Sequence, residues 1–235
     1  QNVKSKQIKM KKIYSEIYSQ SIKNPEEFWE NVSNDIFWYK KPKKILNKSN
    51  APFFKWFEDG VTNTCYNALD HHIDQGKGEK IALIYDSPIT NKKAKFTFNQ
   101  LREKVSKFAG ALDNQGVNKG DRVIIYMPMI PEAVIAMLAC GRIGAIHSVV
   151  FGGFASNELA NRIDDSKAKV LITASCGYEP GKTVEYKPLV DEALKLAKHK
   201  VQKVILFQRK GNEVKLNKPL ELNWDEALSN ANNKD

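Results

Sequence analysis

From residue 81 onward, short apolar runs alternate with longer segments in which apolar residues recur every three or four positions. The run Val123-Ile124-Ile125-Tyr126 is typical of a buried strand. The spacing of Leu101, Val105, Phe108 and Leu112 is typical of one face of a helix. This alternation of the two patterns predicts βαβ units.

The pattern also fixes approximate boundaries. A strand at 81–85 and a second at 94–98 predict a hairpin, and the following helix is expected to end at Gly116, a common helix stop. The remaining predicted elements are strands at 122–127, 145–150, 169–174 and 203–207 and helices at 99–115, 131–142, 156–166 and 188–198. We therefore expect an α/β fold, a mostly parallel sheet of βαβ units with helices on both faces.

The first sixty residues follow a different pattern. Ile8, Ile13 and Ile17 predict an opening helix over about 6–20. In the second predicted helix, Asn24 can act as the N-cap, with Pro25 at the first helical position and Glu27 completing a capping box. The aromatic, lysine-rich stretch 37–60 has no sustained period, and we interpret it as an extended arm lying on the rest of the protein.

The boundary between these patterns predicts two parts. Residues 1–60 form a helical and extended amino-terminal arm, and residues 61–235 form the α/β part, opened by a helix over about 64–75. The last stretch, 212–235, is rich in asparagine and charge, and we expect Trp224 to anchor it.

The formal net charge of +10 raises the possibility of a nucleic-acid binder. The excess is local: residues 1–50 carry eleven lysines against five acids, and 195–218 carry eight basic residues against one, whereas 51–194 balances at seventeen of each. Five of the 37 basic residues are arginine, the side chain that base and phosphate readers favour. We interpret the charge as a solvated lysine-rich surface and expect no nucleic-acid partner.

Two features bear on location. No apolar stretch approaches the roughly 20 residues that a membrane-spanning helix needs, so no membrane anchor is expected. Cys65, Cys140 and Cys176 lack the spacing of a zinc site or a disulfide framework and are interpreted as reduced thiols. We expect an intracellular protein, in the cytoplasm or the mitochondrial matrix.

In an open parallel sheet, ligands bind beyond the carboxyl ends of the strands, so the loops after 127, 150 and 174 are the places to search. Gly152-Gly153 follows a buried strand and lets a phosphate or an adenine ring approach the backbone, although a tight turn alone explains the pair. The turn Tyr178-Glu179-Pro180-Gly181-Lys182 presents one lysine to an anion. The connector Met127-Pro128-Met129-Ile130-Pro131 is apolar and is expected to pack.

Other candidate residues are weaker. His71 and His72 are neighbours on a predicted helix, where side chains point about 100° apart, so they are not a natural metal pair. His147 is expected to be a core histidine inside a buried strand, and Asp164 and Asp165 have no obvious partner. The sequence contains no GxxxxGK[ST], GxSxG or HExxH motif. No self-sufficient active site is therefore expected.

Longer stretches resemble a known family. Trp56-Phe57-Glu58-Asp59-Gly60, the run from Gly120 to Ala133, and above all the run from Ala136 to Phe154 resemble the start of the acetyl-CoA synthetase group of adenylate-forming enzymes. The resemblance covers about Tyr14 to Gly211. At 179–182, where acetyl-specific enzymes tend to have arginine-alanine-glycine-arginine, this sequence is closer to the propionyl-CoA synthetase branch.

The resemblance implies a two-step ligase. Acetate or propionate and ATP form an acyl-adenylate and pyrophosphate, with Mg²⁺, and the thiol of coenzyme A then displaces AMP. By the same resemblance, the coenzyme A nucleotide would lie along Phe151, Gly152 and Gly153, with Glu179, Pro180, Gly181, Lys182 and Val184 nearby. Lys182 would meet a phosphate.

The family's phosphate loop, carboxylate pocket and catalytic lysine would follow Asp235. We therefore expect no catalytic residue here, an amino-terminal fragment that is inactive alone, and the remainder of its own polypeptide as a partner. The alternative is a stand-alone, non-catalytic module that binds coenzyme A or a nucleotide.

Overall fold

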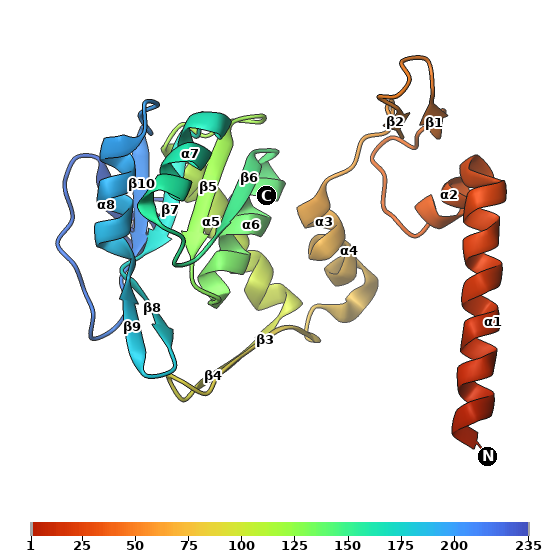
Figure 1. The fold of residues 1–235 in the computed structure, drawn as a ribbon, viewed down its shortest axis with the longest axis horizontal. Coiled ribbons are helices and arrows are strands. Elements are labelled where there is room, and N and C mark those ends of the chain that lie inside the picture. The colour runs from red at the N-terminus through yellow and green to blue at the C-terminus, as the bar shows by residue number, and fades with distance from the viewer. Residues whose placement is uncertain (1, 235) are drawn as a thin grey trace. The chain divides into compact units, whose positions relative to one another are not determined.

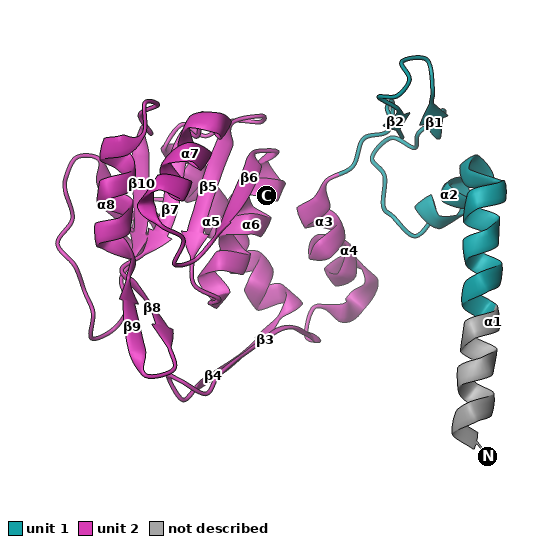
Figure 2. Ribbon diagram, in the orientation of Figure 1, with its two compact units in different colours: residues 1–62 teal, residues 63–235 magenta. Residues whose placement is uncertain are grey.

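The computed structural model describes the backbone of residues 2–234 and the side chains of residues 13–234. The chain divides into two compact units, residues 1–62 and residues 63–235, coloured separately in Figure 2.

Unit 1 begins with two helices, α1 (Asn2–Lys23) and α2 (Pro25–Ser33). Pro25 opens α2, as the sequence predicts. The predicted capping role of Asn24 is wrong: its backbone has φ −129° and ψ 66°, and its side chain makes no capping hydrogen bond. An N-cap residue needs an extended backbone to turn its side chain over the first turn of the helix, and this ψ is far from extended.

The stretch 37–60 of unit 1 is largely irregular. Strands β1 (Leu46–Asn47) and β2 (Lys55–Trp56) pair antiparallel, with Leu46 opposite Trp56. The Asp59 carboxylate accepts the backbone N–H of Lys43 at 3.1 Å, and this bond joins the two ends of the stretch.

Unit 2 starts with a helical segment that is interrupted. The sequence predicts one helix over 64–75, but the structure has α3 (Thr64–Ala68), α4 (Asp70–His72) and the π-helical turn η1 (Ile73–Lys77). The break falls at Leu69, whose φ of −126° and ψ of −69° leave the helical region. Leu69 is buried in the core, which the helical period alone does not reveal.

A hairpin and a long helix follow. Strands β3 (Ile81–Ser87) and β4 (Lys92–Thr97) pair antiparallel, which confirms the predicted hairpin. Helix α5 (Phe98–Asn114) starts with a capping box, in which the Thr97 side chain accepts from the Gln100 N–H and the Gln100 side chain accepts from the Thr97 N–H. The cap fixes the start of the helix at the end of the hairpin.

Within the described residues, the centre of unit 2 is a parallel sheet of five strands in the order β11-β10-β7-β5-β6. Every pairing between neighbouring strands in this sheet is parallel. The strands are β5 (Arg122–Met127), β6 (Ile146–Phe151), β7 (Val170–Ala174), β10 (Lys203–Phe207) and β11 (Glu221–Asn223). The predicted α/β class and mostly parallel sheet are confirmed.

Helices cover both faces of this sheet (Figure 1). α5, α6 (Pro131–Ile143) and α9 (Trp224–Ser229) cover one face, and α7 (Ser156–Ser166) and α8 (Tyr186–Leu196) cover the other. Because side chains alternate along a strand, β5 contributes to two cores. Its odd-numbered residues pack with the first set of helices and its even-numbered residues with the second.

Strand β11 and helix α9 lie in the tail, for which the sequence predicts no element. Trp224 stacks on Phe108 with ring centroids 3.8 Å apart and is 3% exposed. The prediction that Trp224 anchors the tail is therefore confirmed. The anchor also places β11 beside β10 at the edge of the sheet.

The three cysteines are free and buried. Burial raises the pKa of the Cys65 thiol to about 11 and that of Cys140 to about 12, so at neutral pH both are protonated and chemically quiet. No helix in the described part of the chain is long and apolar enough to cross a membrane.

Candidate functional site

The carboxyl ends of the parallel strands meet at one end of unit 2. The hairpin of β8 (Cys176–Glu179) and β9 (Lys182–Glu185) and the turn between β3 and β4 also lie there (Figure 1). A cavity of about 380 Å³ opens there. It is lined by residues of the β3–β4 turn, the ends of β5 and β6, the β8 strand, the start of α8, and Arg209 after β10. Its volume is within the range of small-molecule sites, about 300–1,000 Å³.

The turn after β6 is held by Tyr126 of β5. The Tyr126 hydroxyl accepts the Gly153 N–H at 3.2 Å and donates to the Phe154 carbonyl at 2.8 Å. Gly153 has φ +94°, a conformation that favours glycine, and a Cβ there would meet no atom within 4 Å. The backbone at Gly153 therefore has open space beside it, while Phe151 is 72% exposed next to it.

Gly152 is required for a different reason. A Cβ at this position would collide with the Tyr186 hydroxyl and stand 3.0 Å from the Met127 carbonyl oxygen. A Cβ on Gly177, in the next loop, would lie 2.8 Å from the same hydroxyl. Tyr186, buried at the start of α8, therefore fills the space between the turn after β6 and the β8 strand. It fits there because Gly152 and Gly177 have no side chain.

The second predicted loop, residues 178–182, was expected to be a turn and is the end of a β-hairpin. β8 (Cys176–Glu179) and β9 (Lys182–Glu185) pair antiparallel around Pro180 and Gly181, and Gly181 has φ +75°. The Lys182 ammonium forms an ion pair with the Glu179 carboxylate at 3.0 Å, with both side chains exposed. The cation expected to meet a phosphate is thus already paired within its own hairpin.

The structure brings together part of the predicted set. Phe151, Gly152 and Glu179 line the cavity. The other predicted residues stand on the same two loops without lining it: Gly153, Pro180, Gly181, Lys182 and Val184. The two predicted loops therefore meet at one cavity, but fewer residues line the cavity than were predicted for the site.

Predictions for three other places have mixed outcomes. The connector 127–131 is buried at Met127, Ile130 and Pro131, as expected, but Met129 is 92% exposed. His147 is exposed, because β6 is the last strand of the sheet as the structure describes it. Asp164 has a partner, since its carboxylate accepts the His199 N–H at 2.7 Å and so ties the end of α7 to the segment after α8.

The sequence reading missed Arg209. This residue is 9% exposed and lines the cavity, with its guanidinium carbon 4.8 Å from the centre of the Tyr178 ring. The sequence carries a signal for it, because Arg209 stands two residues after a buried strand, at the same edge of the sheet as the predicted ligand-binding loops. It fell instead within a stretch interpreted as lysine-rich surface.

A second cavity, of about 630 Å³, lies between β4, α5, α6 and α9, on the face of the sheet that these helices cover. Its lining mixes lysines with carboxylates, among them Glu132. Burial raises the pKa of Glu132, opposed by its own backbone N–H and by the positive charges of Arg209 and Lys104. This mixture of signs does not select a ligand.

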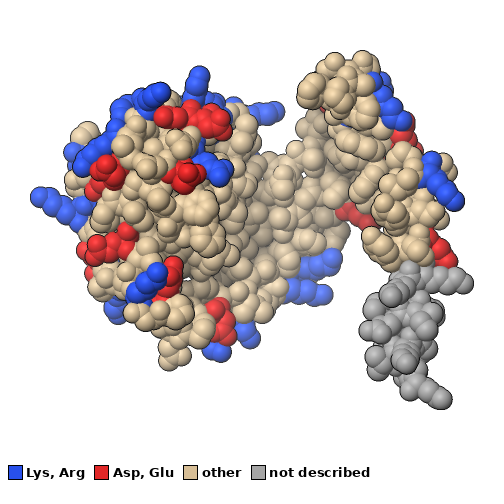
Figure 3. All heavy atoms as spheres, viewed as in Figure 1, with Lys and Arg blue, Asp and Glu red and all other residues tan. Residues whose placement is uncertain are grey.

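The charges elsewhere are interspersed. On the face of unit 2 seen in Figure 3, lysine and arginine side chains alternate with aspartate and glutamate, without one continuous basic surface. Among residues 13–234, no group of three or more histidine, cysteine or acidic side chains is placed to hold a metal ion.

Two family models match the chain, one after the other. Residues 14–68 match the model described as acetyl-coenzyme A synthetase N-terminus, and residues 69–234 match the model described as AMP-binding enzyme. Together they account for almost the whole chain.

Two acyl-CoA synthetases illustrate the similarity of the chain to known proteins. It is 52% identical over 223 residues to human acyl-CoA synthetase short-chain family member 3, mitochondrial, covering 94% of this chain and 32% of that protein. It is 45% identical over 216 residues to acetyl-coenzyme A synthetase of Streptomyces coelicolor, covering 92% and 33%. The chain thus spans about a third of the length of these relatives.

The fold has a solved counterpart. Acetoacetyl-CoA synthetase from Streptomyces lividans superposes with a TM-score of 0.79 at 25% identity, over 91% of this chain and 32% of that one. The structural match therefore includes residues of both units. It corresponds to about a third of the longer protein, as the sequence matches do.

Proposed function

Because this chain belongs to the AMP-binding enzyme family, we propose that it is the amino-terminal part of an ATP-dependent short-chain acyl-CoA ligase. The complete enzyme would join acetate or propionate to coenzyme A through an acyl-adenylate, releasing pyrophosphate and then AMP. Mg²⁺ would assist at the ATP phosphates, held outside the residues described here.

The observation that carries the proposal is the meeting of two loops at one cavity. Phe151 and Gly152 follow β6, Glu179 ends β8, and all three line the cavity at the carboxyl edge of the sheet. Parallel α/β sheets bind their ligands at this edge. The share of the chain in this proposal is to bind the nucleotide end of coenzyme A.

The residues at the cavity would contact different parts of the coenzyme A nucleotide. The exposed Phe151 ring offers a face on which an adenine can stack, and Gly153 leaves its backbone open. Lys182 supplies a positive charge for a phosphate, and it would have to leave Glu179 to do so. We propose that Glu179 moderates the affinity for the phosphate in this way.

The edge of the sheet supports a further polypeptide as partner. β6 has an unpaired side within the described residues, and its Ile146 and Val149 are more than half exposed. Strands of parallel sheets are ordinarily covered on both faces. We propose that the remainder of the polypeptide covers β6, that it carries the adenylation chemistry, and that this chain alone is inactive.

The proposed setting is intracellular, in the cytoplasm or the mitochondrial matrix. The buried, free cysteines accord with a reducing compartment. Neither a membrane nor a nucleic acid is proposed as a partner.

The second candidate function is a non-catalytic module that binds coenzyme A or a nucleotide. It is favoured by the cavity, whose lining comes from several elements of unit 2. Under this reading the same loops bind the same ligand, and no longer protein performs the chemistry.

Two measurements test the proposal together. Calorimetric titration of the chain with coenzyme A should show binding, and exchange of labelled pyrophosphate into ATP, with acetate or propionate, should occur with the longest reading frame that contains the chain and not with the chain alone. Exchange by the chain alone would refute its inactivity. Binding without exchange by either protein would favour the module, and absence of both would remove the proposal.

A further inference from the structure

Arg209 is held in place on both sides by its backbone. Its N–H donates to the Ser175 hydroxyl at 2.9 Å, and its carbonyl accepts the Asn212 N–H at 2.9 Å. Ser175 in turn donates its own N–H to the Phe207 carbonyl at 2.9 Å. The guanidinium therefore projects from a fixed point at the carboxyl ends of β7 and β10.

The side chain is also fixed by stacking. Its guanidinium lies against the Tyr178 ring at 4.8 Å. The Tyr178 hydroxyl donates to the Lys210 carbonyl at 3.1 Å and accepts from the Asn212 amide at 2.8 Å. Tyr178 thus covers one face of the guanidinium and fixes its plane, so the N–H edge is presented without a large entropy loss on binding.

The guanidinium has no anionic partner among residues 13–234. It makes no hydrogen bond and no ion pair there, although Arg209 is nine-tenths buried. The two acids in the cavity lining pair with lysines instead: Asp86 with Lys93 at 2.8 Å and Glu179 with Lys182 at 3.0 Å. Glu132 feels the charge of Arg209 but forms no ion pair with it.

The guanidinium nitrogens have no partner among the described residues and are not fully enclosed, so an anion entering the cavity can reach them and pair with the charge. A guanidinium presents N–H donors in a planar fork, which matches two oxygens of a phosphate. The cavity also has the exposed aromatic ring of Phe151 at its rim. A charged fork and an aromatic face together fit a ligand that joins a phosphate to a base.

We propose that Arg209 binds a phosphate of a nucleotide ligand in this cavity, stacked on Tyr178 and separate from the charge that Lys182 provides. This inference rests on the proposed function for the identity of the ligand, and on the geometry of Arg209 for the anion. The phosphate belongs either to the adenosine bisphosphate end of coenzyme A or to an adenosine 5′-phosphate, and the experiment separates the two.

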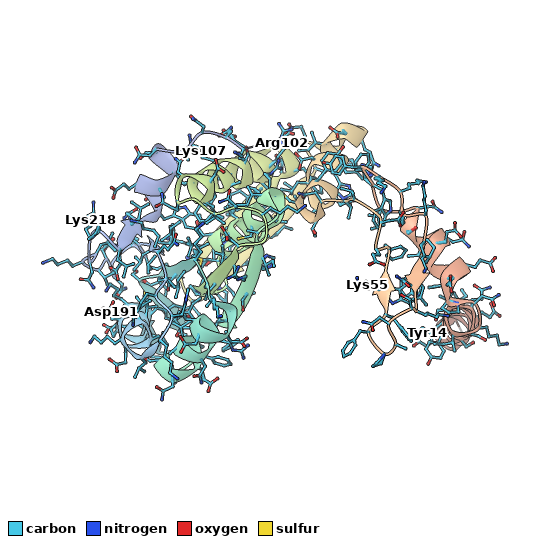
Figure 4. All side chains as sticks on the ribbon, turned by 90° about the horizontal axis from the view of Figure 1, so that it is seen from above. Tyr14, Lys55, Arg102, Lys107, Asp191 and Lys218 are labelled. Carbon is cyan, nitrogen blue, oxygen red and sulfur yellow. The ribbon has the colours of Figure 1, made fainter. Side chains whose placement is uncertain are left out.

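The test is calorimetric titration of the full chain with coenzyme A, adenosine 3′,5′-bisphosphate, AMP, ATP and inorganic phosphate. Arg209→Gln should weaken the nucleotide that binds by about 10- to 100-fold, the loss expected for hydrogen bonds to a charged group. Arg209→Lys should recover part of the affinity. The control is Arg102→Gln, which changes an exposed arginine on α5 (Figure 4) outside the cavity lining and should bind like the unaltered chain.

The outcomes separate the two proposals. If coenzyme A binds and Arg209→Gln leaves its affinity unchanged, the role of Arg209 is wrong and the proposed function stands. If only AMP, ATP or phosphate binds and the loss follows Arg209, the anion site stands and the coenzyme A assignment fails. If none of the five binds, both are overturned.

A second readout covers the case in which Arg209→Gln does not fold. The ¹⁵Nε–¹H resonance of Arg209 in the unaltered chain, assigned by its disappearance in Arg209→Lys, should shift on titration with the bound nucleotide. An unchanged Arg209 resonance at saturation contradicts the inference.

Discussion

The Tyr186 hydroxyl occupies the space that a Cβ on Gly152 would fill. Tyr186 begins α8, and Gly152 follows β6, so this one contact joins two elements that are distant in the sequence. The pair explains why the turn after β6 needs a glycine at its first position, independently of any ligand.

Gly152→Ala should destabilise the chain by about 1–3 kcal/mol, the usual cost of overpacking. In a Tyr186→Phe background the cost should fall, because the colliding oxygen is gone, and it should not vanish, because the ring carbon and the Met127 carbonyl remain 3.0 Å away. Urea denaturation of the four proteins gives the coupling, expected to be about 1 kcal/mol.

Gly141→Ala is the matched control. It lies inside α6, and the nearest neighbour of a Cβ there is 3.7 Å away. Alanine should be neutral or stabilising by up to about 1 kcal/mol at such a position. An equal cost of Gly152→Ala in both backgrounds would show that Tyr186 is not the cause.

Glu179→Gln should tighten binding of coenzyme A. It frees Lys182 from an ion pair in which both side chains are more than one-third exposed, so the gain should be no more than about fivefold, the scale of a surface pair. It should shrink as salt is raised. Calorimetric titration at two ionic strengths measures both effects.

The control breaks a pair of the same spacing, Lys195 with Glu192 on α8. Glu192→Gln should leave the affinity unchanged. Weaker binding by Glu179→Gln would mean that the Glu179 carboxylate contacts the ligand itself.

Lys187 of α8 joins this helix to the tail of the chain through a buried ion pair. It is buried and donates to Asp191 (labelled in Figure 4) at 2.6 Å while pairing with Glu221 of β11 at 3.1 Å. Lys187→Met leaves the buried Glu221 carboxylate without its cation, and the expected loss is about 3–5 kcal/mol. Lys187→Met with Glu221→Gln should recover part of that loss, and Lys195→Met should cost little.

The pH dependence of this contribution follows from the pKa of Lys187. Burial opposes its charge, but the hydrogen bonds to Asp191 and Glu221 prevail and raise the pKa of Lys187 above 10.5. The stabilisation is therefore complete below the unfolded value and is lost as pH rises through the folded one. Urea denaturation should give the same difference between the two proteins at pH 7 and pH 9, and a difference that faded over this range would contradict the assignment.

Glu132, unlike Lys187, should destabilise the chain in its charged form. Burial raises its pKa above 4.5, so the folded state holds this proton more tightly, and stability falls as pH rises through the folded pKa. Glu132→Gln should raise the melting temperature at pH 7 and leave it nearly unchanged at pH 4. The control is Glu103→Gln, an exposed carboxylate of the same cavity, for which no gain at pH 7 is expected.

Local patterns were sufficient for most of unit 2. The apolar run at 122–127 and the helical spacing from 99 to 115 predicted β5 and α5 closely, because side-chain periods of two and 3.6 follow from the backbone of each element alone. The carboxyl edge of the sheet was predicted as the place of the ligand-binding loops from the predicted βαβ units, because open parallel sheets bind ligands there. The break at Leu69 was not, since it depends on what that residue packs against.

Tertiary structure decided which groups meet. The sequence by itself indicated an α/β chain of this family and two loops that could hold a nucleotide. Only the fold placed Arg209 against Tyr178, Glu179 against Lys182 and the Tyr186 hydroxyl against Gly152. Such contacts depend on the register of neighbouring strands and on how the helices pack. The hydrophobic period within one element contains no information about either, so the sequence pattern could not predict which side chains from different elements meet.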